Sequence, residues 1–406
     1  MIEQDGTASS PETARVAVIG AGTMGAGIAQ VALEAGWRVA LHDPYPGATD
    51  RALERIRDGL IRRAAKSGGG DFARSASKAL LGLEVAVDVE SAVSDASLAI
   101  EAAVEDLDVK RALFRELDAA APPDAVLATN TSALSVSSIA EAASRPDRVV
   151  GLHFFNPAPV LPLVEVVAGR ASAPWAVERA AAIVEGWGKT PIRVADAPGF
   201  IVNRVNRPFT LEPLRLLRAG AASIETIDQA IEQAGFRMGP FALMDLIGID
   251  VNLAAARGLF EASGRPPRFR PSPIQEELVG AGRLGRKTGE GFYRYGDGKR
   301  TGPAARFAAS AGPRAAAAGI DPATIAERVI LAIVNEAYRA LGDGVAVEED
   351  IDRALQLGAN HPFGPFEWTH QTGLHEVVVM LGALSDEDAD TFRPALTLLR
   401  ATRAGI

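Results

Sequence analysis

The chain has 406 residues, of which 48% are hydrophobic, and a formal net charge of −9. This length exceeds what one hydrophobic core usually serves, so we expect about two or three domains. The acidic balance argues against a nucleic-acid surface, and no apolar run approaches the roughly 18 to 20 residues that cross a bilayer. Cysteine is absent, which excludes disulfides, a thiolate nucleophile and a cysteine-bound metal. We expect a cytoplasmic protein with no nucleic-acid partner, no membrane partner and no metal, whose polar residues 1–14 form a disordered tail.

Residues 15–195 alternate between short apolar runs and helical patterns. Strands are predicted near Arg15–Gly20, Arg38–Asp43, Leu98–Glu101, Val126–Thr129 and Val149–His153. Helices are predicted at Met24–Ala35, Asp106–Ala119 and Val136–Ala142. This alternation is typical of a mainly parallel sheet covered on both faces, as in an α/β Rossmann-type domain.

From residue 196 the sequence instead predicts helices separated by Gly and Pro turns. A motif recurs there, because Asp228 followed by Gly239-Pro240-Phe241 and Gly248 resembles Asp352 followed by Gly364-Pro365-Phe366 and Gly373. We therefore expect two helical copies, at residues 196–295 and 321–406. The Gly-, Ala- and Arg-rich residues 296–320 between them are expected to be a linker.

The first strand is followed by a glycine-rich turn, Gly20-Ala21-Gly22-Thr23-Met24-Gly25, which opens the first helix. A G-x-G-x-x-G turn in this context binds a dinucleotide pyrophosphate at the helix N-terminus, so Gly20, Gly22, Thr23, Met24 and Gly25 are expected to contact the cofactor. Asp43 ends the second strand about twenty residues later, where a carboxylate binds the adenosine ribose and repels a 2′-phosphate. This favours NAD, although Asp43 could also be a loop residue that merely ends the strand.

Polar side chains gather where the later strands end. His153 follows a late strand of the nucleotide domain, and imidazole can accept an alcohol proton near neutral pH while hydride leaves for the nicotinamide. Glu165 could orient that ring and stabilise its charged form. The structural alternatives are a hydrogen-bonded strand histidine and a solvated edge glutamate. The other four histidines precede the ribose aspartate or lie in the last helical copy.

From residue 15 to about residue 295 the sequence resembles the L-3-hydroxyacyl-CoA dehydrogenase family, which includes 3-hydroxybutyryl-CoA dehydrogenases. Beyond the glycine turn, the motifs that carry the resemblance are Glu101–Glu105 (EAAVE), Asn130–Ser132 (NTS), His153–Pro157 (HFFNP), Pro198–Arg204 (PGFIVNR) and Gly285–Tyr293 (GRKTGEGFY). The last helical copy resembles a second C-terminal module of this family. The resemblance implies helical domains like the C-terminal part of 6-phosphogluconate dehydrogenase.

The resemblance implies reversible, NAD-dependent oxidation of an (S)-3-hydroxyacyl-CoA to a 3-oxoacyl-CoA, a reaction of fatty acid β-oxidation. His153 would be the general base, Glu165 its partner, and Ser132 and Asn203 would contact the substrate oxygen or the nicotinamide. Positions that hold NAD in the family are matched by Glu105, Lys110, Ser132, Asn156 and Lys287. Ser132 could instead cap a helix, Asn203 could be a helix-face polar residue, and Lys287 could be ordinary surface charge.

The predicted CoA-binding helix departs most from the family pattern. Lys66 matches a lysine that meets CoA phosphates, but Gly59 stands where a serine contacts the ligand, and Arg62 and Arg63 could supply positive charge instead. Two other functions stay open: a dehydrogenase of a free hydroxy or sugar acid, and a non-catalytic NAD-binding relative. The duplicated helical copies predict either a homodimer or a monomer in which the second copy packs on the first as a pseudo-dimer.

Overall fold

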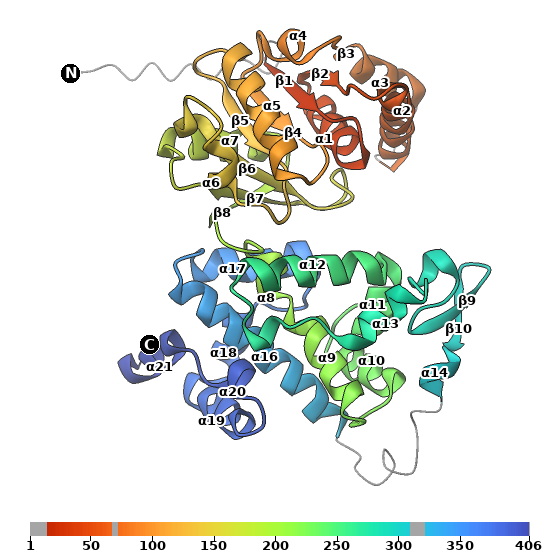
Figure 1. Cartoon of the computed structure of the whole chain (residues 1–406), viewed down its shortest axis with the longest axis vertical. Coiled ribbons are helices and arrows are strands. Elements are labelled where there is room, and N and C mark those ends of the chain that lie inside the picture. The colour runs from red at the N-terminus through yellow and green to blue at the C-terminus, as the bar shows by residue number, and fades with distance from the viewer. Residues whose placement is uncertain (1–13, 67–71, 309–320, 406) are drawn as a thin grey trace. The chain divides into compact units, whose positions relative to one another are not determined.

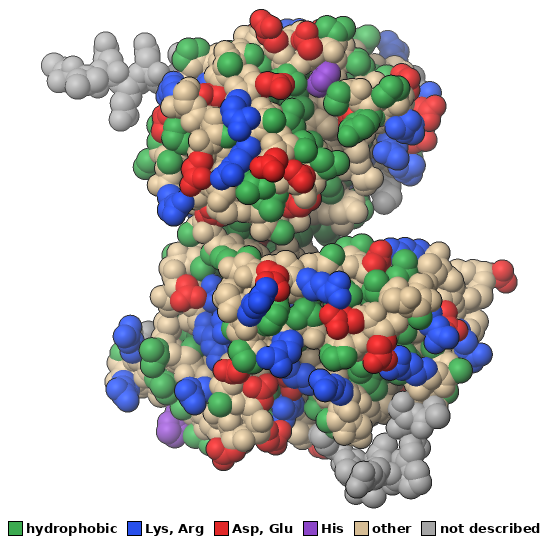
Figure 2. All heavy atoms as spheres, in the orientation of Figure 1, with side chains coloured by type: hydrophobic (Ala, Val, Ile, Leu, Met, Phe, Trp, Pro, Cys, Tyr) green, Lys and Arg blue, Asp and Glu red, His purple; other side chains and the backbone are tan. Residues whose placement is uncertain are grey.

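The computed structural model describes residues 14–66, 72–308 and 321–405. The chain divides into two compact units, Met1–Ala197 and Pro198–Ile406 (Figure 1). The predicted disordered tail, apart from Ala14, lies outside the described residues, as does the latter part of the predicted linker, residues 309–320. No helix in the described ranges combines the length and the apolar character needed to span a bilayer. On the face drawn in Figure 2, acidic and basic side chains are interspersed over both units.

The described residues of the first unit, 14–66 and 72–197, form one sheet of eight strands in the order β3-β2-β1-β4-β5-β6-β7-β8. Strands β1 to β6 pair in parallel, β7 runs antiparallel to β6, and β8 is parallel to β7. The predicted Rossmann-type, mainly parallel sheet is confirmed. The strands are β1 (Arg15–Ile19), β2 (Arg38–His42), β3 (Leu83–Val85), β4 (Leu98–Glu101), β5 (Val126–Thr129), β6 (Val149–Phe154), β7 (Leu163–Ala168) and β8 (Thr190–Ala195).

Helices cover both faces of this sheet, and alternate residues of β1 show why its strands are almost wholly apolar. Val16 and Val18 pack in a core with α1, α2 and α7, whereas Ala17 and Ile19 pack in a second core with α4, α5 and α6. The helices are α1 (Thr23–Glu34), α2 (Ala48–Lys66), α3 (Phe72–Leu80), α4 (Val89–Val93), α5 (Leu107–Ala120), α6 (Val136–Ala140) and α7 (Pro174–Gly186).

Within the residues that the structure describes, the second unit is helical apart from one β-hairpin. Its elements are α8 (Val202–Val205), α9 (Pro208–Arg218), α10 (Ile224–Gln233), α11 (Pro240–Ile247), α12 (Ile249–Ala262), α13 (Pro273–Gly280), β9 (Tyr293–Gly296), β10 (Lys299–Pro303), α14 (Ala305–Ala308), α16 (Pro322–Gly342), α17 (Glu348–Ala359), α18 (Pro365–Thr372), α19 (Leu374–Ser385), α20 (Ala389–Phe392) and α21 (Leu396–Ala404). The structure thus departs from the expected linker, because β10 and α14 occupy its first residues. Asp297 and Gly298 both have positive φ, which suits a tight hairpin turn.

The repeated sequence motif forms the same local structure twice. The Asp228 carboxylate accepts hydrogen bonds from the backbone N–H groups of Phe241 and Ala242 at the start of α11. Asp352 does the same for Phe366 and Glu367 at the start of α18. A buried carboxylate at a helix N-terminus satisfies amides that have no partner within the helix. The repeated residues are therefore caps that define where a helix begins in each copy.

The two helical copies pack against each other within the chain. Helix α16 of the second copy contacts α9 and α10 of the first. The Nε of Arg204 lies 2.8 Å from Glu336 Oε1, and the Nε of Arg328 lies 2.5 Å from Glu212 Oε1. Both glutamates are almost completely buried. Each copy therefore contributes one arginine that pairs with a buried glutamate of the other copy.

Candidate functional site

The glycine-rich turn has the geometry expected for holding a dinucleotide. Gly20 has φ of +109°, and a Cβ there would lie 2.5 Å from the carbonyl oxygen of Ala102. A Cβ on Gly25 would overlap the carbonyl of Gly20, so α1 packs directly on the turn. A Cβ on Gly22 would meet no atom within 4 Å, which leaves space beside the N-terminus of α1. The chain thus offers backbone amides and room for a pyrophosphate.

Asp43 lies beside this turn, just after β2. Its Oδ2 accepts a hydrogen bond of 2.7 Å from the N–H of Ala21, and its Oδ1 accepts one from Tyr45 N. The side chain is partly exposed. The carboxylate is therefore fixed against the glycine-rich turn, where an adenosine ribose is expected.

A buried charge network lies at the adjoining end of β4. Lys110, from α5, is 1% exposed, and its Nζ donates to Glu101 Oε1 at 2.6 Å. The same Nζ lies 3.3 Å from Glu105 Oε2. Thr129 donates to the other oxygen of Glu101 at 2.7 Å. Lys110 is thus enclosed between two carboxylates, in a position to orient Glu105.

Glu105 in turn organises the residues after β5. Its Oε1 accepts hydrogen bonds from the Thr131 hydroxyl at 2.6 Å and from the Ser132 N–H at 3.0 Å. Burial opposes ionisation of Glu105, but the Thr131 hydroxyl, the Lys110 charge and the Ser132 amide hold its pKa below the ordinary value. An ionised Glu105 therefore fixes the backbone at Ser132, which is exposed.

His153 and Glu165 lie directly opposite each other on the antiparallel strands β6 and β7. The His153 Nδ1 is 2.6 Å from Glu165 Oε2, and both side chains are buried. Opposite residues of an antiparallel pair place their side chains on the same face of the sheet, which explains the contact. By contrast His361, in the second unit, is enclosed, and burial lowers its pKa to about 3.

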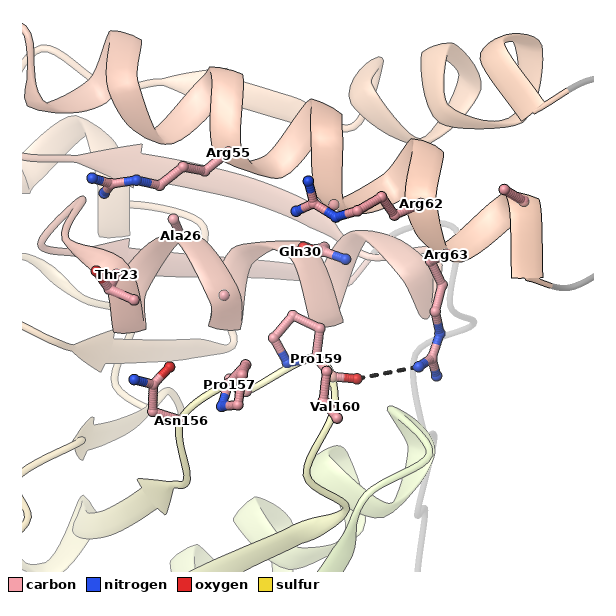
Figure 3. Close-up of a pocket in the computed structure, with 14 residues that line it drawn as sticks. Thr23, Ala26, Gln30, Arg55, Arg62, Arg63, Asn156, Pro157, Pro159 and Val160 are labelled. Carbon is pink, nitrogen blue, oxygen red and sulfur yellow. Dashed lines mark hydrogen bonds between the residues drawn. The ribbon is translucent and has the colours of Figure 1, made fainter. Parts of the chain in front are cut away.

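A groove of about 520 Å³ runs along α1, with α2 on one side and the loop after β6 on the other (Figure 3). Thr23, Gly27 and Gln30 of α1 line it, together with Asn156 and Pro159 of the loop. Two residues predicted to bind the cofactor, Thr23 and Asn156, therefore lie in one groove. Its remaining polar lining comes from α2.

The groove face of α2 is positively charged. Arg55, Gly59 and Arg62 recur at helical spacing and all line the groove, with Arg63 beside them. At Gly59 a Cβ would overlap the side-chain amide of Gln30 on α1, so a larger residue here would require that amide to move. The backbone of Lys66 ends α2, and its side chain lies outside the described part of the chain.

Two cations fix the loop that forms the other wall of the groove. The Nζ of Lys189 donates to the carbonyl oxygens of Ala158 and Leu161, at 2.6 and 3.0 Å. Arg63 donates to the carbonyl of Pro159 at 3.3 Å (Figure 3). Burial, together with the Arg63 charge, lowers the pKa of Lys189 to about 8. Hydrogen bonds from Lys189 and Arg63 therefore hold the backbone of this loop in place.

The remaining predicted residues belong to the second unit. Asn203 is partly buried in α8. Lys287 lies in the Gly285–Tyr293 motif, where its Nζ binds both oxygens of Asp250 at 2.6 and 2.7 Å. That motif folds around the buried carboxylate of Asp245, which accepts hydrogen bonds from Phe292 N and Tyr293 N. The motif thus has a structural role of its own.

Sequence patterns alone do not assign site roles to Glu101, Arg55 or Lys189. Arg55 carries a usable signal, because it lies one turn before Gly59 and two before Arg62 on the same helical face. Glu101 opens the motif Glu101–Glu105, which marks the position but not its partners, and Lys189 carries no signal, since its role depends on which distant residues pack against it.

Comparisons with known proteins identify the family of the chain. A model of the family described as "3-hydroxyacyl-CoA dehydrogenase, NAD binding domain" matches residues 15–197. A model described as "3-hydroxyacyl-CoA dehydrogenase, C-terminal domain" matches residues 199–295 and 325–405. The matches therefore span the glycine turn, the His153–Glu165 pair and both helical copies.

Individual relatives match over most of their length. The 3-hydroxyadipyl-CoA dehydrogenase of Escherichia coli K12 is 38% identical, over 95% of this chain and 96% of its own. The mitochondrial hydroxyacyl-coenzyme A dehydrogenase of Homo sapiens is 41% identical, over 69% of this chain and 90% of its own. The crystal structure of 3-hydroxybutyryl-CoA dehydrogenase from E. coli K12 matches with a TM-score of 0.87 and 36% identity, covering 97% of this chain and 98% of that one. The chain is therefore an NAD-dependent oxidoreductase that belongs to the 3-hydroxyacyl-CoA dehydrogenase family.

Proposed function

We propose that the protein catalyses the reversible oxidation of an (S)-3-hydroxyacyl-CoA to the 3-oxoacyl-CoA, with His153 as the general base. The observation that carries this proposal is the 2.6 Å contact between His153 Nδ1 and Glu165 Oε2 on opposite strands. With Nδ1 held by a buried carboxylate, Nε2 is the ring nitrogen that takes the hydroxyl proton. Glu165 then stabilises the imidazolium that forms.

When bound, NAD would supply the acceptor for the hydride that leaves the carbon carrying the hydroxyl group. The turn from Gly20 to Gly25 and the N-terminus of α1 would hold its pyrophosphate, and Asp43 its adenosine ribose. Ser132, Asn156, Glu105 and Lys287 complete the proposed cofactor contacts, with Lys110 acting through Glu105. Ser132 and Asn203 would donate hydrogen bonds to the substrate oxygen, where negative charge develops.

The groove beside α1 supports an acyl-CoA as the substrate class. CoA carries phosphate groups, and the groove presents Arg55 and Arg62 on its α2 side. The side chains of both arginines are exposed, so they can bind a phosphate with little rearrangement. Lys66, the last residue of α2, is also proposed to bind the CoA phosphates.

The test is NADH oxidation with acetoacetyl-CoA by the protein and by His153→Gln. We expect the variant to lose nearly all turnover while its affinity for NADH, measured by fluorescence titration, stays close to that of the parent. Glu165→Gln should reduce kcat by on the order of 100-fold, because the buried imidazolium loses its counter-charge. Retained turnover in His153→Gln would contradict the mechanism. The substrate panel should include the 3-oxo counterparts of 3-hydroxybutyryl-CoA and 3-hydroxyadipyl-CoA, the substrates in the relatives' names.

A further inference from the structure

The loop that walls the groove beside α1 takes its backbone contacts from two basic side chains of different kinds. Arg63 lies on α2, lines the groove and donates to the carbonyl of Pro159 (Figure 3). Lys189 directly precedes β8 and is only 9% exposed. Its Nζ donates to the carbonyls of Ala158 and Leu161, on either side of the Arg63 contact. The position of this wall therefore depends on a lysine that is itself buried.

Lys189 differs from the other buried lysine of this unit in what binds its charge. Lys110 lies 2.6 Å from a carboxylate oxygen of Glu101, whereas the Nζ of Lys189 binds two neutral carbonyl oxygens. The charged groups that act on Lys189 are Arg63 on α2 and Glu34 on α1, and Glu34 lies 3.7 Å from Arg63. Residues 155–162 of the loop include no ionisable side chain. Among the described residues, no carboxylate therefore forms an ion pair with this ammonium group.

This environment makes the charge of Lys189 depend on what occupies the groove. Burial is the main cause that lowers the pKa of Lys189 to about 8, and repulsion from Arg63 adds to it. A phosphate that paired with Arg63 would offset this repulsion, so the pKa of Lys189 would rise in the complex. By thermodynamic reciprocity, a protonated Lys189 then strengthens binding of the phosphate by the same free energy. The proton is present below about pH 8 and is lost as the pH rises above it.

We propose that Lys189 is a positioning residue for the thioester: its ammonium group fixes the loop wall of the groove, so that binding of the CoA phosphates is coupled to a proton on Lys189. This inference rests on the proposed function and adds a residue that acts through the loop and Arg63. A neutral amine can still donate to a carbonyl, but hydrogen bonds from a charged donor are stronger. Loss of the proton therefore loosens the wall and removes positive charge beside it. The thioester should bind more weakly as the pH rises, through a group other than His153.

The test is calorimetric binding of acetoacetyl-CoA to the protein in the presence of NAD. Both reactants are then oxidised, so no turnover disturbs the measurement. From about pH 7 to about pH 9.5 the dissociation constant should rise by on the order of 3- to 10-fold. Phosphate monoesters have a second pKa of about 6, so the phosphates of CoA do not titrate in this range. Binding near the middle of the range should take up a fraction of a proton, which titrations in two buffers of different ionisation enthalpy measure.

Three variants separate this role from a purely structural one. Lys189→Arg keeps its charge throughout the pH series, so it should bind acetoacetyl-CoA without proton uptake and with an affinity that no longer depends on pH. Lys189→Met lacks both the charge and the donors, so it should bind weakly at every pH and change the KM for the thioester more than kcat. Lys78→Met, which changes an exposed lysine of α3 outside the groove lining, should behave as the parent does. If the Met variant at residue 189 fails to fold, the parent and the Arg variant still decide.

A dissociation constant that stays constant over this pH range in the parent would overturn the inference. So would a pH dependence that persists in Lys189→Arg, because the titrating group would then lie elsewhere. In both cases, turnover of acetoacetyl-CoA by the parent would leave the proposed function intact. If the parent oxidises no NADH with acetoacetyl-CoA, the proposed function itself fails, and the role of Lys189 fails with it.

Discussion

Glu212 and Glu336 occupy the same position in the two helical copies, and each is buried against an arginine from the other copy. Arg328 of the second copy reaches Glu212, and Arg204 of the first reaches Glu336. In a twofold-symmetric contact, if one residue touches another, the reverse contact also occurs. The two copies therefore pack as the halves of a dimer would, within a single chain.

The first prediction concerns this contact. Glu336 is 1% exposed and is bound by Arg204, Arg268 and Arg339. Removing it by Glu336→Ala leaves buried positive charge without a partner, so we expect a loss of about 3 to 5 kcal/mol in the free energy of unfolding. Urea unfolding followed by circular dichroism measures this loss.

The matched control for that prediction is Glu276→Ala, which breaks an exposed ion pair with Arg257. Exposed pairs contribute little, so this loss should be below about 1 kcal/mol. Similar losses in the two variants would mean that the buried pair is not a main support of the contact between the copies.

A second prediction concerns the charged face of α2. Arg62→Ala should raise the KM for acetoacetyl-CoA by on the order of tenfold and leave the KM for NADH nearly unchanged, because one charge-assisted contact to a phosphate is lost. The effect should shrink as salt concentration rises. Arg57→Ala is the control, since Arg57 is exposed on the same helix and does not line the groove. A selective rise in the KM for NADH would reject the assignment of this groove to CoA.

A third prediction concerns the choice of cofactor. Asp43→Asn removes the negative charge but keeps an oxygen that can accept the Ala21 hydrogen bond. We expect the ratio of kcat/KM for NADH over NADPH to fall by on the order of tenfold or more, because a 2′-phosphate is no longer repelled. Steady-state rates with both cofactors measure the ratio. An unchanged ratio would show that Asp43 only holds the turn.

A fourth prediction concerns pH. Burial raises the pKa of Asp228 to about 6, against hydrogen bonds from Phe241, Tyr293 and Ala242 that lower it. Between about pH 4 and 6 the folded chain therefore binds a proton that the unfolded chain has lost, so stability from this group declines as pH rises. Asp228→Asn has no titrating carboxyl group at this position, so the variant lacks this pH-dependent contribution to stability. The free energy of unfolding of the parent minus that of the variant should fall by up to about 3 kcal/mol from pH 4 to pH 7. A difference that rises with pH would contradict the assigned shift.

The parts of the fold that sequence could predict are those set by local rules. The glycine turn follows from backbone conformation at Gly20 and Gly25, and the His153–Glu165 pair from polar residues at strand ends. The sequence contains a signal for the hairpin of β9 and β10, because Asp297-Gly298 favours a tight turn. The surrounding Gly- and Arg-rich composition predicts a linker instead.

What sequence could not supply depends on packing between distant elements. Lys110 matches a family position that holds NAD, yet its burial between Glu101 and Glu105 follows from how α5 lies on β4.

Helix α1 begins at the glycine turn and also lines the groove through Thr23, Gly27 and Gln30. Any substitution that tilts this helix would move both binding surfaces at once, whereas one in α2 would move a single wall. We therefore expect substitutions in α1 to change the KM for both NADH and the thioester. Substitutions in α2 should change the KM for the thioester alone. Under the proposed assignment of the groove to CoA, α2 is thus the element on which substrate range can be altered while cofactor binding is kept.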